Sequence, residues 1–346
     1  MPPKQPSRNP DPVVVLVGCS GLLGKEIKER LAGGSFAGTS VRLFETGGRQ
    51  GTLTDFAGEA AVAPGVEEDS FEDADIVVLA CGPGEAGRLV GYRRKSGSVV
   101  IDVSSRSGEP GGPIVNCDVN PKVLEAHRGM VEAPQPVALM LSTLLGRIDQ
   151  EAGVESAEAV VFEPASGMGE FGQAAMDELY QQTVRLLSFE SVPQETFGRQ
   201  IAFNLVPLSL APLLGGAGRE EASADQARRV LGWEPERLSL RMIVAPVFHC
   251  HAALLRVTAS RAPSASRILR ALRSGGSFDV ASPPDRPGDG PATPAEWAGE
   301  EKIRVAEIRE DPRGASWIWF VADDLKAGAA LNVVRIAESL LFGREY

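Results

Sequence analysis

The chain has 346 residues, 43% of them hydrophobic and 23% charged, and this length and balance predict two domains of a soluble globular protein. The formal net charge of -11 comes without a basic stripe, which excludes nucleic acid as an expected partner because phosphate contacts need clustered Lys and Arg. The four cysteines have no C-x-x-C spacing and the apolar runs are too short to span a membrane, so we expect reduced thiols and a cytoplasmic location.

The N-terminal part has the pattern of an α/β, Rossmann-like, doubly wound domain. Residues 1–12 are Pro-rich and polar, and we expect a disordered tail there. An apolar run at Val13–Val17 is followed by a Gly-rich turn and by a helix expected over Lys25–Leu31. Apolar runs without polar alternation predict further parallel strands, covered on both faces, at Val41–Phe44, Ile76–Ala80 and Val99–Val103.

The pattern changes after Val154 to longer strands and helices, which predict an α+β domain. The segment Ala281–Pro294 is rich in Pro, Gly and Asp and predicts a surface loop. The regular elements expected here are strands at Ala157–Phe162, Leu238–Pro246 and Ala252–Ala259, a helix near Gln173–Ser188 and a last helix from Lys326 to Leu341.

The turn after the first strand is a candidate site for a dinucleotide. Its sequence is Gly18-Cys19-Ser20-Gly21-Leu22-Leu23-Gly24, between a strand and a helix, so backbone N–H groups can approach a pyrophosphate. The glycine spacing departs from G-x-G-x-x-G, and the alternative is a turn that only the fold requires.

The residues that follow the neighbouring strands bear on which dinucleotide binds. Glu45 lies about 20 residues beyond the turn, where a carboxylate commonly binds the ribose 2′-hydroxyl and repels a 2′-phosphate, which favours NAD. Arg49, in the next loop, would instead suit the 2′-phosphate of NADP. The alternative for both residues is a solvated loop without a ligand. Gly82 and Ser104 follow the next strands and are expected to line the same cleft.

Four segments carry specific motifs of another kind. A Ser-Gly-x-Gly loop lies at Ala165–Gly169, and a Phe-Asn-x-x-Pro strand is expected at Phe203–Pro207. A Pro-Val segment that ends in His lies at Ala245–His251, and an Asp-Asp-Leu-Lys segment lies at Ala322–Ala330. Together they resemble the aspartate-semialdehyde dehydrogenase family, over nearly the whole chain past residue 12.

This resemblance implies the domain organisation and the partners. It implies a nucleotide-binding domain made of residues 13–133 plus 328–346 and a dimerisation domain at 134–327, with a homodimer as the assembly. The cofactor it implies is NAD or NADP, with Gly167 and Asp324 among the residues that contact it. A small-molecule ligand is the other expected partner.

The resemblance also implies a covalent mechanism, most of whose residues are replaced in this chain. In the family a cysteine at a helix start attacks an aldehyde as a thiolate, a histidine acts as acid and base, and phosphate cleaves the thioester. Pro136 replaces the cysteine, whereas His251 retains the histidine position. The glutamine, arginine and lysine that hold substrate and phosphate correspond to Glu163, Val244 and Ser223.

Two functions remain open on this pattern. The first is a pseudoenzyme related to amino-acid biosynthesis, which binds a nucleotide but lacks the nucleophile; Phe197–Asn204 is similar to a subgroup of the family without the cysteine. The second is an NAD(P)-dependent oxidoreductase that acts non-covalently on another small aldehyde or alcohol, with His251 and Glu163 as acid and base.

His249, Cys250 and His251 suggest two further alternatives. A metal site would need a third and fourth ligand that the sequence does not offer nearby, so we expect no metal. Cys250 as a substitute nucleophile is opposed by the alternation of side chains along a strand, which turns it away from His251 and predicts a buried, inert thiol.

Overall fold

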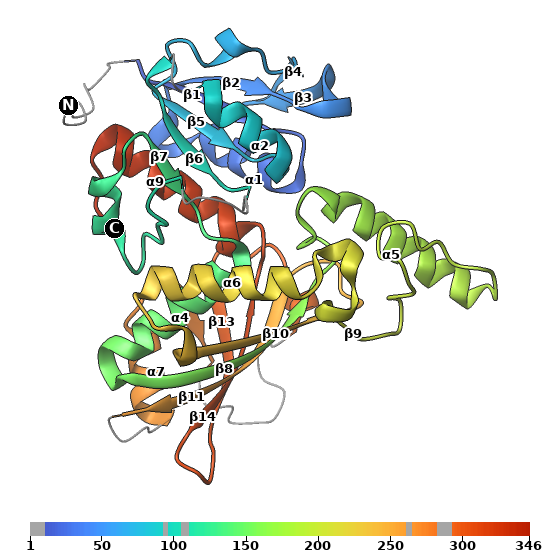
Figure 1. Ribbon diagram of the computed structural model, residues 1–346, viewed down its shortest axis with the longest axis vertical. Coiled ribbons are helices and arrows are strands. Elements are labelled where there is room, and N and C mark those ends of the chain that lie inside the picture. The colour runs from blue at the N-terminus through green and yellow to red at the C-terminus, as the bar shows by residue number, and fades with distance from the viewer. Residues whose placement is uncertain (1–10, 93–95, 105–110, 261–264, 282–292) are drawn as a thin grey trace. The chain divides into compact units, whose positions relative to one another are not determined.

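The chain folds into two compact units, each described here by itself. One comprises residues 1–135 and 329–346, and the other comprises residues 136–328. The computed structural model describes residues 11–92, 96–104, 111–260, 265–281 and 293–346 (Figure 1). The tail expected at 1–12 and the loop expected at Ala281–Pro294 fall almost entirely outside these ranges.

The first unit is a parallel sheet covered by helices on both faces, which confirms the predicted α/β fold. Strand β1 (Val13–Val17) sends Val14 and Leu16 into the core under α1 and α9, and Val15 and Val17 into the core under α2. Burial on both faces explains why the whole run is apolar. The sheet order is β2-β1-β5-β6-β7, with β2 Ser40–Phe44, β5 Ile76–Leu79, β6 Val99–Asp102, β7 Met130–Glu132, α1 Leu22–Leu31, α2 Pro83–Leu89 and α9 Leu331–Phe342.

A hairpin of β3 (Thr52–Phe56) and β4 (Glu59–Ala63) in this unit was not predicted. Ala57 and Gly58 form its turn with φ of 53° and 85°, the left-handed backbone that two-residue hairpins require. Leu53 and Val62 pair across the two strands, and both side chains are exposed. The period-2 pattern fails here because the apolar residues of the pair face solvent and not a core.

The second unit is a seven-stranded mixed sheet with α4, α6 and α7 on one face (Figure 1). Alternate residues of β8, such as Ala157, Ala159 and Val161, enter the core beneath these helices. The order is β12-β13-β14-β11-β8-β10-β9, with β8 Val154–Glu163, β9 Val206–Pro207, β10 Leu238–Val244, β11 His251–Ala259, β12 Phe278–Val280, β13 Ile303–Glu310, β14 Ser316–Ala322, α4 Pro136–Ala152, α5 Gly172–Leu187, α6 Gly216–Leu231, α7 Ala265–Arg273 and α8 Pro294–Trp297.

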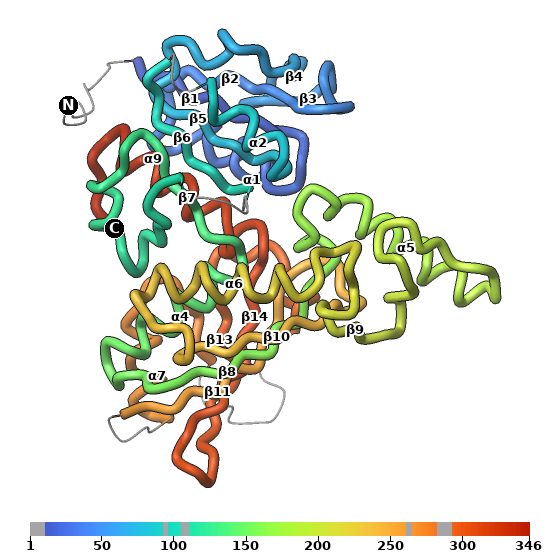
Figure 2. Tube along the Cα trace, in the orientation of Figure 1, coloured from blue at the N-terminus to red at the C-terminus, as the bar shows by residue number. Residues whose placement is uncertain are grey.

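The expected strand at Phe203–Pro207 is wrong for most of its length. Only Val206 and Pro207 pair with a neighbour, and Phe203 has a φ of 59°. The preceding backbone has another partner, because Ile201 and Ala202 donate to Gln182 Oε1 of α5 at 2.7 and 3.1 Å. Helix α5 lies away from the sheet (Figure 2), and these hydrogen bonds attach the segment to α5.

The end of the second unit also differs from the expected last helix. Residues Lys326–Ala330 form a π-helical turn, and α9 starts only at Leu331. Strands β13 and β14 were not predicted. In β13, charged side chains at four of the eight positions interrupt the apolar pattern of a strand. Within the described ranges, the helices fall short of the length and hydropathy needed to cross a bilayer.

Candidate functional site

The glycine turn of the first unit has the geometry of a close backbone approach. Gly18 follows β1 with a φ of 84°, and a Cβ there would lie 2.2 Å from the carbonyl oxygen of Ala80. A Cβ on Gly24 would lie 1.9 Å from the carbonyl oxygen of Gly18. Both positions therefore require glycine. The turn ends at Gly21, the residue before α1, so the first N–H groups of that helix point out of the turn, as a dinucleotide cradle requires.

Two charged side chains of opposite sign flank this turn. The Glu45 carboxylate is buried and accepts a hydrogen bond from the backbone N–H of Ser20. Arg49 is exposed, and its Nη1 would lie 3.5 Å from a Cβ on Gly21. The solvated-loop alternative is therefore wrong for Glu45, whose carboxylate is part of the turn. Leu22 and Leu23, on the first turn of α1, are half-buried.

Gly82 and Ser104, the two other residues of the first unit that are expected near a dinucleotide, lie at the same edge of its sheet. Gly82 is the residue before α2 and follows β5, the neighbour of β1. Ser104 follows β6, and both its N–H and its Oγ donate to Asp102 Oδ1, at 2.9 and 2.6 Å. The carboxyl ends of parallel strands share one edge, where such folds bind ligands. Ser105 and Arg106 lie outside the described residues.

In the second unit, Pro136 is the first residue of α4, as expected. Its fixed φ and missing N–H are compatible with a first helical turn, so the helix forms without the family's cysteine. Gly328 of the π-helical turn packs against the ring, since a Cβ there would lie 3.1 Å from Pro136 Cβ. The position is thus filled by a side chain that has no nucleophilic atom.

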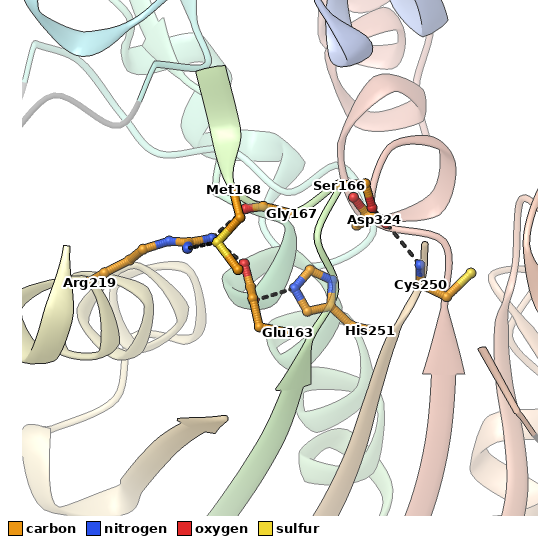
Figure 3. Close-up of polar contacts among 8 residues, drawn as sticks. All are labelled: Glu163, Ser166, Gly167, Met168, Arg219, Cys250, His251 and Asp324. Atoms are coloured by element: carbon orange, nitrogen blue, oxygen red, sulfur yellow. Dashed lines mark hydrogen bonds and ion pairs between the residues drawn. The ribbon is translucent and has the colours of Figure 1, made fainter. Parts of the chain in front are cut away.

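Glu163, His251 and Arg219 form a buried polar cluster in this unit (Figure 3). The antiparallel register of β8 and β11 pairs Phe162 with Ala252, and this brings Glu163 at the end of β8 near His251 at the start of β11. Glu163 Oε2 lies 2.6 Å from His251 Nε2, and Glu163 Oε1 contacts the Arg219 guanidinium from α6. The glutamate and histidine side chains are 0% and 1% exposed, so the charges interact without solvent screening.

The cluster favours the charged forms of Glu163 and His251. Burial opposes ionisation of Glu163, but Arg219 and His251 outweigh it and lower the pKa of this carboxyl. Burial also disfavours the imidazolium of His251, but the neighbouring Glu163 carboxylate outweighs it and raises the pKa of His251. A carboxylate paired with an imidazolium is an arrangement that can donate a proton.

Asp324 lies beside this cluster with one carboxyl oxygen engaged. Its Oδ1 accepts hydrogen bonds from Ser166 Oγ and from the backbone N–H of Cys250, both at 3.0 Å. Burial raises the pKa of this carboxyl. Its Oδ2 and the Nδ1 of His251 are buried without a hydrogen-bond partner among the described residues. Both atoms therefore leave hydrogen-bonding capacity for a ligand.

The buried thiols are poor nucleophiles. Burial raises the pKa of Cys19 and of Cys117 to about 12, and burial together with Asp323 and Asp324 raises the pKa of Cys250. Cys250 packs against apolar side chains of the neighbouring strands, as an inert thiol should. The described part of the chain contains no group of three or more His, Cys, Asp or Glu side chains suited to a metal ion.

The two other positions that the resemblance relates to substrate and phosphate binding lie on β10 and α6. Val244, fully buried at the end of β10, pairs with Glu163 across the strands, and Ser223 is buried on α6. Arg219, one helical turn before Ser223, is the residue that sequence reasoning missed. One signal for Arg219 was present in the sequence: it is a cationic residue on α6, the helix on which the resemblance places the phosphate-binding lysine.

We predict a pH dependence that reports on this pair. The raised pKa of His251 contributes stability that is complete below the ordinary value of about 6.5 and is lost as the pH rises through the folded value. The lowered pKa of Glu163 contributes stability that is lost as the pH falls below about 4.3. Urea denaturation should therefore show wild-type stability falling above pH ~6.5, by at most about 1.4 kcal/mol per pH unit.

His251→Gln should flatten this alkaline slope, whereas His249→Gln, two residues away and only half-buried, should retain it. Equal slopes for wild type and His251→Gln would contradict the assignment.

Comparisons with known proteins agree with both units. A semialdehyde dehydrogenase NAD-binding domain matches residues 13–127, and a semialdehyde dehydrogenase dimerisation domain matches residues 144–326. The chain is 26% identical over 334 residues to an aspartate-semialdehyde dehydrogenase of Prochlorococcus marinus, which covers 95% of each chain. It is 27% identical over 334 residues to a USG-1 protein homolog of Azotobacter vinelandii, covering 95% of this chain and 97% of that one.

Solved structures share the fold. Aspartate semialdehyde dehydrogenase II of Vibrio cholerae, complexed with ASA, has a TM-score of 0.85 at 24% identity and covers 97% of this chain and 99% of its own. The Candida albicans enzyme with NADP has a TM-score of 0.68 at 14% identity, covering 95% and 99%. With one domain match spanning more than half of its length and a second on the N-terminal unit, this chain belongs to the semialdehyde dehydrogenase family.

Proposed function

We propose that this protein is an aspartate-semialdehyde-dehydrogenase-like protein that binds a nicotinamide dinucleotide but does not carry out the phosphorylating oxidation. The observation that carries the proposal is Pro136 at the first position of α4. The names of its relatives support an origin in amino-acid biosynthesis. On this proposal the chain belongs to a branch of the family that has lost the cysteine.

The chemistry of the reaction explains why one replacement is decisive. Thioester formation needs a sulfur nucleophile at the aldehyde carbon, and a proline ring has no atom that can replace it. Cys250 is a poor substitute, because its thiol is buried and its pKa is raised. The buried Val244 also offers no guanidinium to a substrate carboxylate.

The first unit supports retained dinucleotide binding. Gly18 and Gly24 meet backbone atoms so closely that no side chain fits, which is the cradle that a pyrophosphate uses. The bound dinucleotide would supply a hydride acceptor or donor. Glu45 is buried at the turn and favours the ribose hydroxyls of NAD, while the exposed Arg49 would suit the phosphate of NADP.

A second candidate function is a non-covalent oxidoreductase for a small aldehyde or alcohol. The Glu163–His251 pair favours it, because the carboxylate holds an imidazolium whose Nδ1 has no partner among the described residues. A protonated His251 can donate to the carbonyl oxygen of an aldehyde during its reduction, and neutral His251 can accept the hydroxyl proton in the reverse direction. A turnover screen of aldehydes and alcohols with NADH, NADPH and their oxidised forms separates this function from the first.

We also propose a homodimer formed through the second unit. The match to the dimerisation domain supports it, as do large apolar side chains that are exposed in the segment following α5. Phe189, Phe203 and Leu205 are 99%, 68% and 57% exposed. Exposed apolar side chains gathered in one region are typical of an interaction surface.

The first prediction concerns repair of the covalent reaction. Pro136→Cys should not restore phosphate-dependent oxidation of aspartate semialdehyde, followed as NADPH absorbance. A buried charged hydrogen-bond pair that is absent at Val244 typically costs about 2 to 5 kcal/mol, or roughly 30-fold to several thousand-fold in rate. Only the combination with Val244→Arg, Glu163→Gln and Ser223→Lys should give detectable turnover.

The wild-type protein serves as the control for this repair. If it already reduces NADP with this substrate and phosphate, the proposal fails, and loss of that activity in Cys250→Ser would identify the thiol that carries the acyl group.

The second prediction concerns the dinucleotide. NAD should stabilise the protein at least as well as NADP, by about 2.7 kcal/mol at a concentration near 100 times the dissociation constant, visible as a shift in thermal melting. Glu45→Gln should weaken the NAD effect, with Arg49→Gln as its matched control. No shift with either dinucleotide would mean that the turn is purely structural, and an NADP preference that Arg49→Gln abolishes would reverse the role given to Glu45.

The third prediction concerns assembly. Sedimentation velocity at micromolar concentration should show a dimer, and Phe203→Glu with Leu205→Glu should shift it to monomer because two charges would be buried in the interface. Leu53→Glu, on a side chain that is 72% exposed in the first unit, should remain dimeric. A monomeric wild-type protein would exclude the proposed interface.

A further inference from the structure

The buried carboxylate of Glu163 lies between two cationic side chains of the second unit. Oε1 contacts the guanidinium of Arg219, and Oε2 lies 2.6 Å from Nε2 of His251 (Figure 3). Each carboxyl oxygen thus has its own cation. This is the pattern by which proteins bind a small carboxylate ligand, except that here the carboxylate belongs to the chain itself.

The surrounding backbone closes on that carboxylate. Arg219 also donates to the carbonyl oxygen of Gly167 and lies 3.5 Å from Met168 Sδ. A Cβ on Gly167 would lie 2.7 Å from Glu163 Oε1, so the loop packs directly over the carboxylate. Glu163 therefore occupies the position at which an external carboxylate would meet Arg219 and His251.

The need for an anion at this point follows from the burial of the cations. The Arg219 side chain is 21% exposed and His251 is 1% exposed. A buried charge without a counter-charge is strongly destabilising, so a negative partner stabilises Arg219 and the protonated form of His251. Because β8 supplies it covalently, the partner is present at high effective concentration and does not dissociate.

We propose that Glu163 is a built-in anion: it fills a carboxylate-binding site formed by Arg219, His251 and the Ser166–Met168 loop, and it restricts the adjoining polar site to uncharged ligands. The inference stands on contacts within the second unit and does not depend on dinucleotide binding or on the lost cysteine. His251 Nδ1 and Asp324 Oδ2 have no hydrogen-bond partner among the described residues, and they offer the donor and the acceptor with which a hydroxyl group pairs.

Chemical rescue tests this proposal. Glu163→Ala should create a carboxylate-sized cavity lined by Arg219 and His251, and acetate should refill it. We expect acetate to raise the melting temperature of this variant by about 2 to 4 °C, equivalent to about a fivefold change in the folding equilibrium. Acetamide, which has the same shape but no charge, should have no such effect at the same concentration and ionic strength.

The matched controls separate charge from volume. Wild-type protein should respond to neither compound, since its site is full. Glu163→Ala with Arg219→Met should lose the acetate effect, because one of the two cations is gone. Leu255→Ala opens a buried apolar cavity on β11 and should not distinguish acetate from acetamide.

A second measurement covers the case in which Glu163→Ala does not fold. The chain has three histidines, so His251 can be titrated by NMR. In Glu163→Gln, which retains the shape of the side chain, the pKa of His251 should fall below its wild-type value, and acetate should not restore it because the amide still fills the site. Wild-type melting that rises with acetate as much as that of the variant, or an unchanged His251 titration in Glu163→Gln, would overturn the proposal.

Discussion

An ionised carboxylate buried in an apolar unit is the constraint on which the arrangement of the second unit depends. Burial alone would keep Glu163 neutral, and only the charges around it make ionisation favourable. The β8–β11 register provides His251, α6 provides Arg219, and the loop after β8 closes over both. Removing one member of such a cluster typically costs about 3 to 5 kcal/mol, which links three separate elements to one side chain.

The scaffold of the family forms with a proline as the first residue of α4. Proline is compatible with the first turn of a helix, so α4 begins at Pro136. Gly328 has no side chain and leaves room for the proline ring. The core beneath α4 and α6 consists mainly of apolar positions set by strand alternation, and Val244 and Met168 belong both to this core and to the site. The fold of this unit therefore does not depend on a cysteine at the start of α4.

In the first unit a single carboxylate links the nucleotide turn to the sheet. Glu45 follows β2, and its side chain accepts the N–H of Ser20, which fixes the turn against the strand that neighbours β1. One donor of the turn is thereby used by the chain itself. The N–H groups at the start of α1 then provide most of the positive end that a pyrophosphate needs.

Elements whose signal is local could be predicted from neighbouring residues alone. The uninterrupted apolar runs predicted the parallel sheet, the glycine turn predicted the approach between Gly18 and Gly24, and Pro136 predicted a helix start without a nucleophile. Each of these follows from backbone sterics or from burial along one element, which neighbouring residues reveal.

Features that depend on distant partners could not be predicted from the sequence, because they arise only when the chain has folded. In the β3–β4 hairpin, the apolar pair Leu53 and Val62 faces solvent. The segment that begins at Ile201 turns because Gln182 of α5 accepts hydrogen bonds from its backbone N–H groups. Arg219 was invisible as a site residue, since its partner Glu163 lies 56 positions away and only the packing of α6 beside β8 brings them together. Charged residues are common on helices, and most are exposed. Such a residue becomes part of a site only when the fold buries it against a side chain of opposite charge.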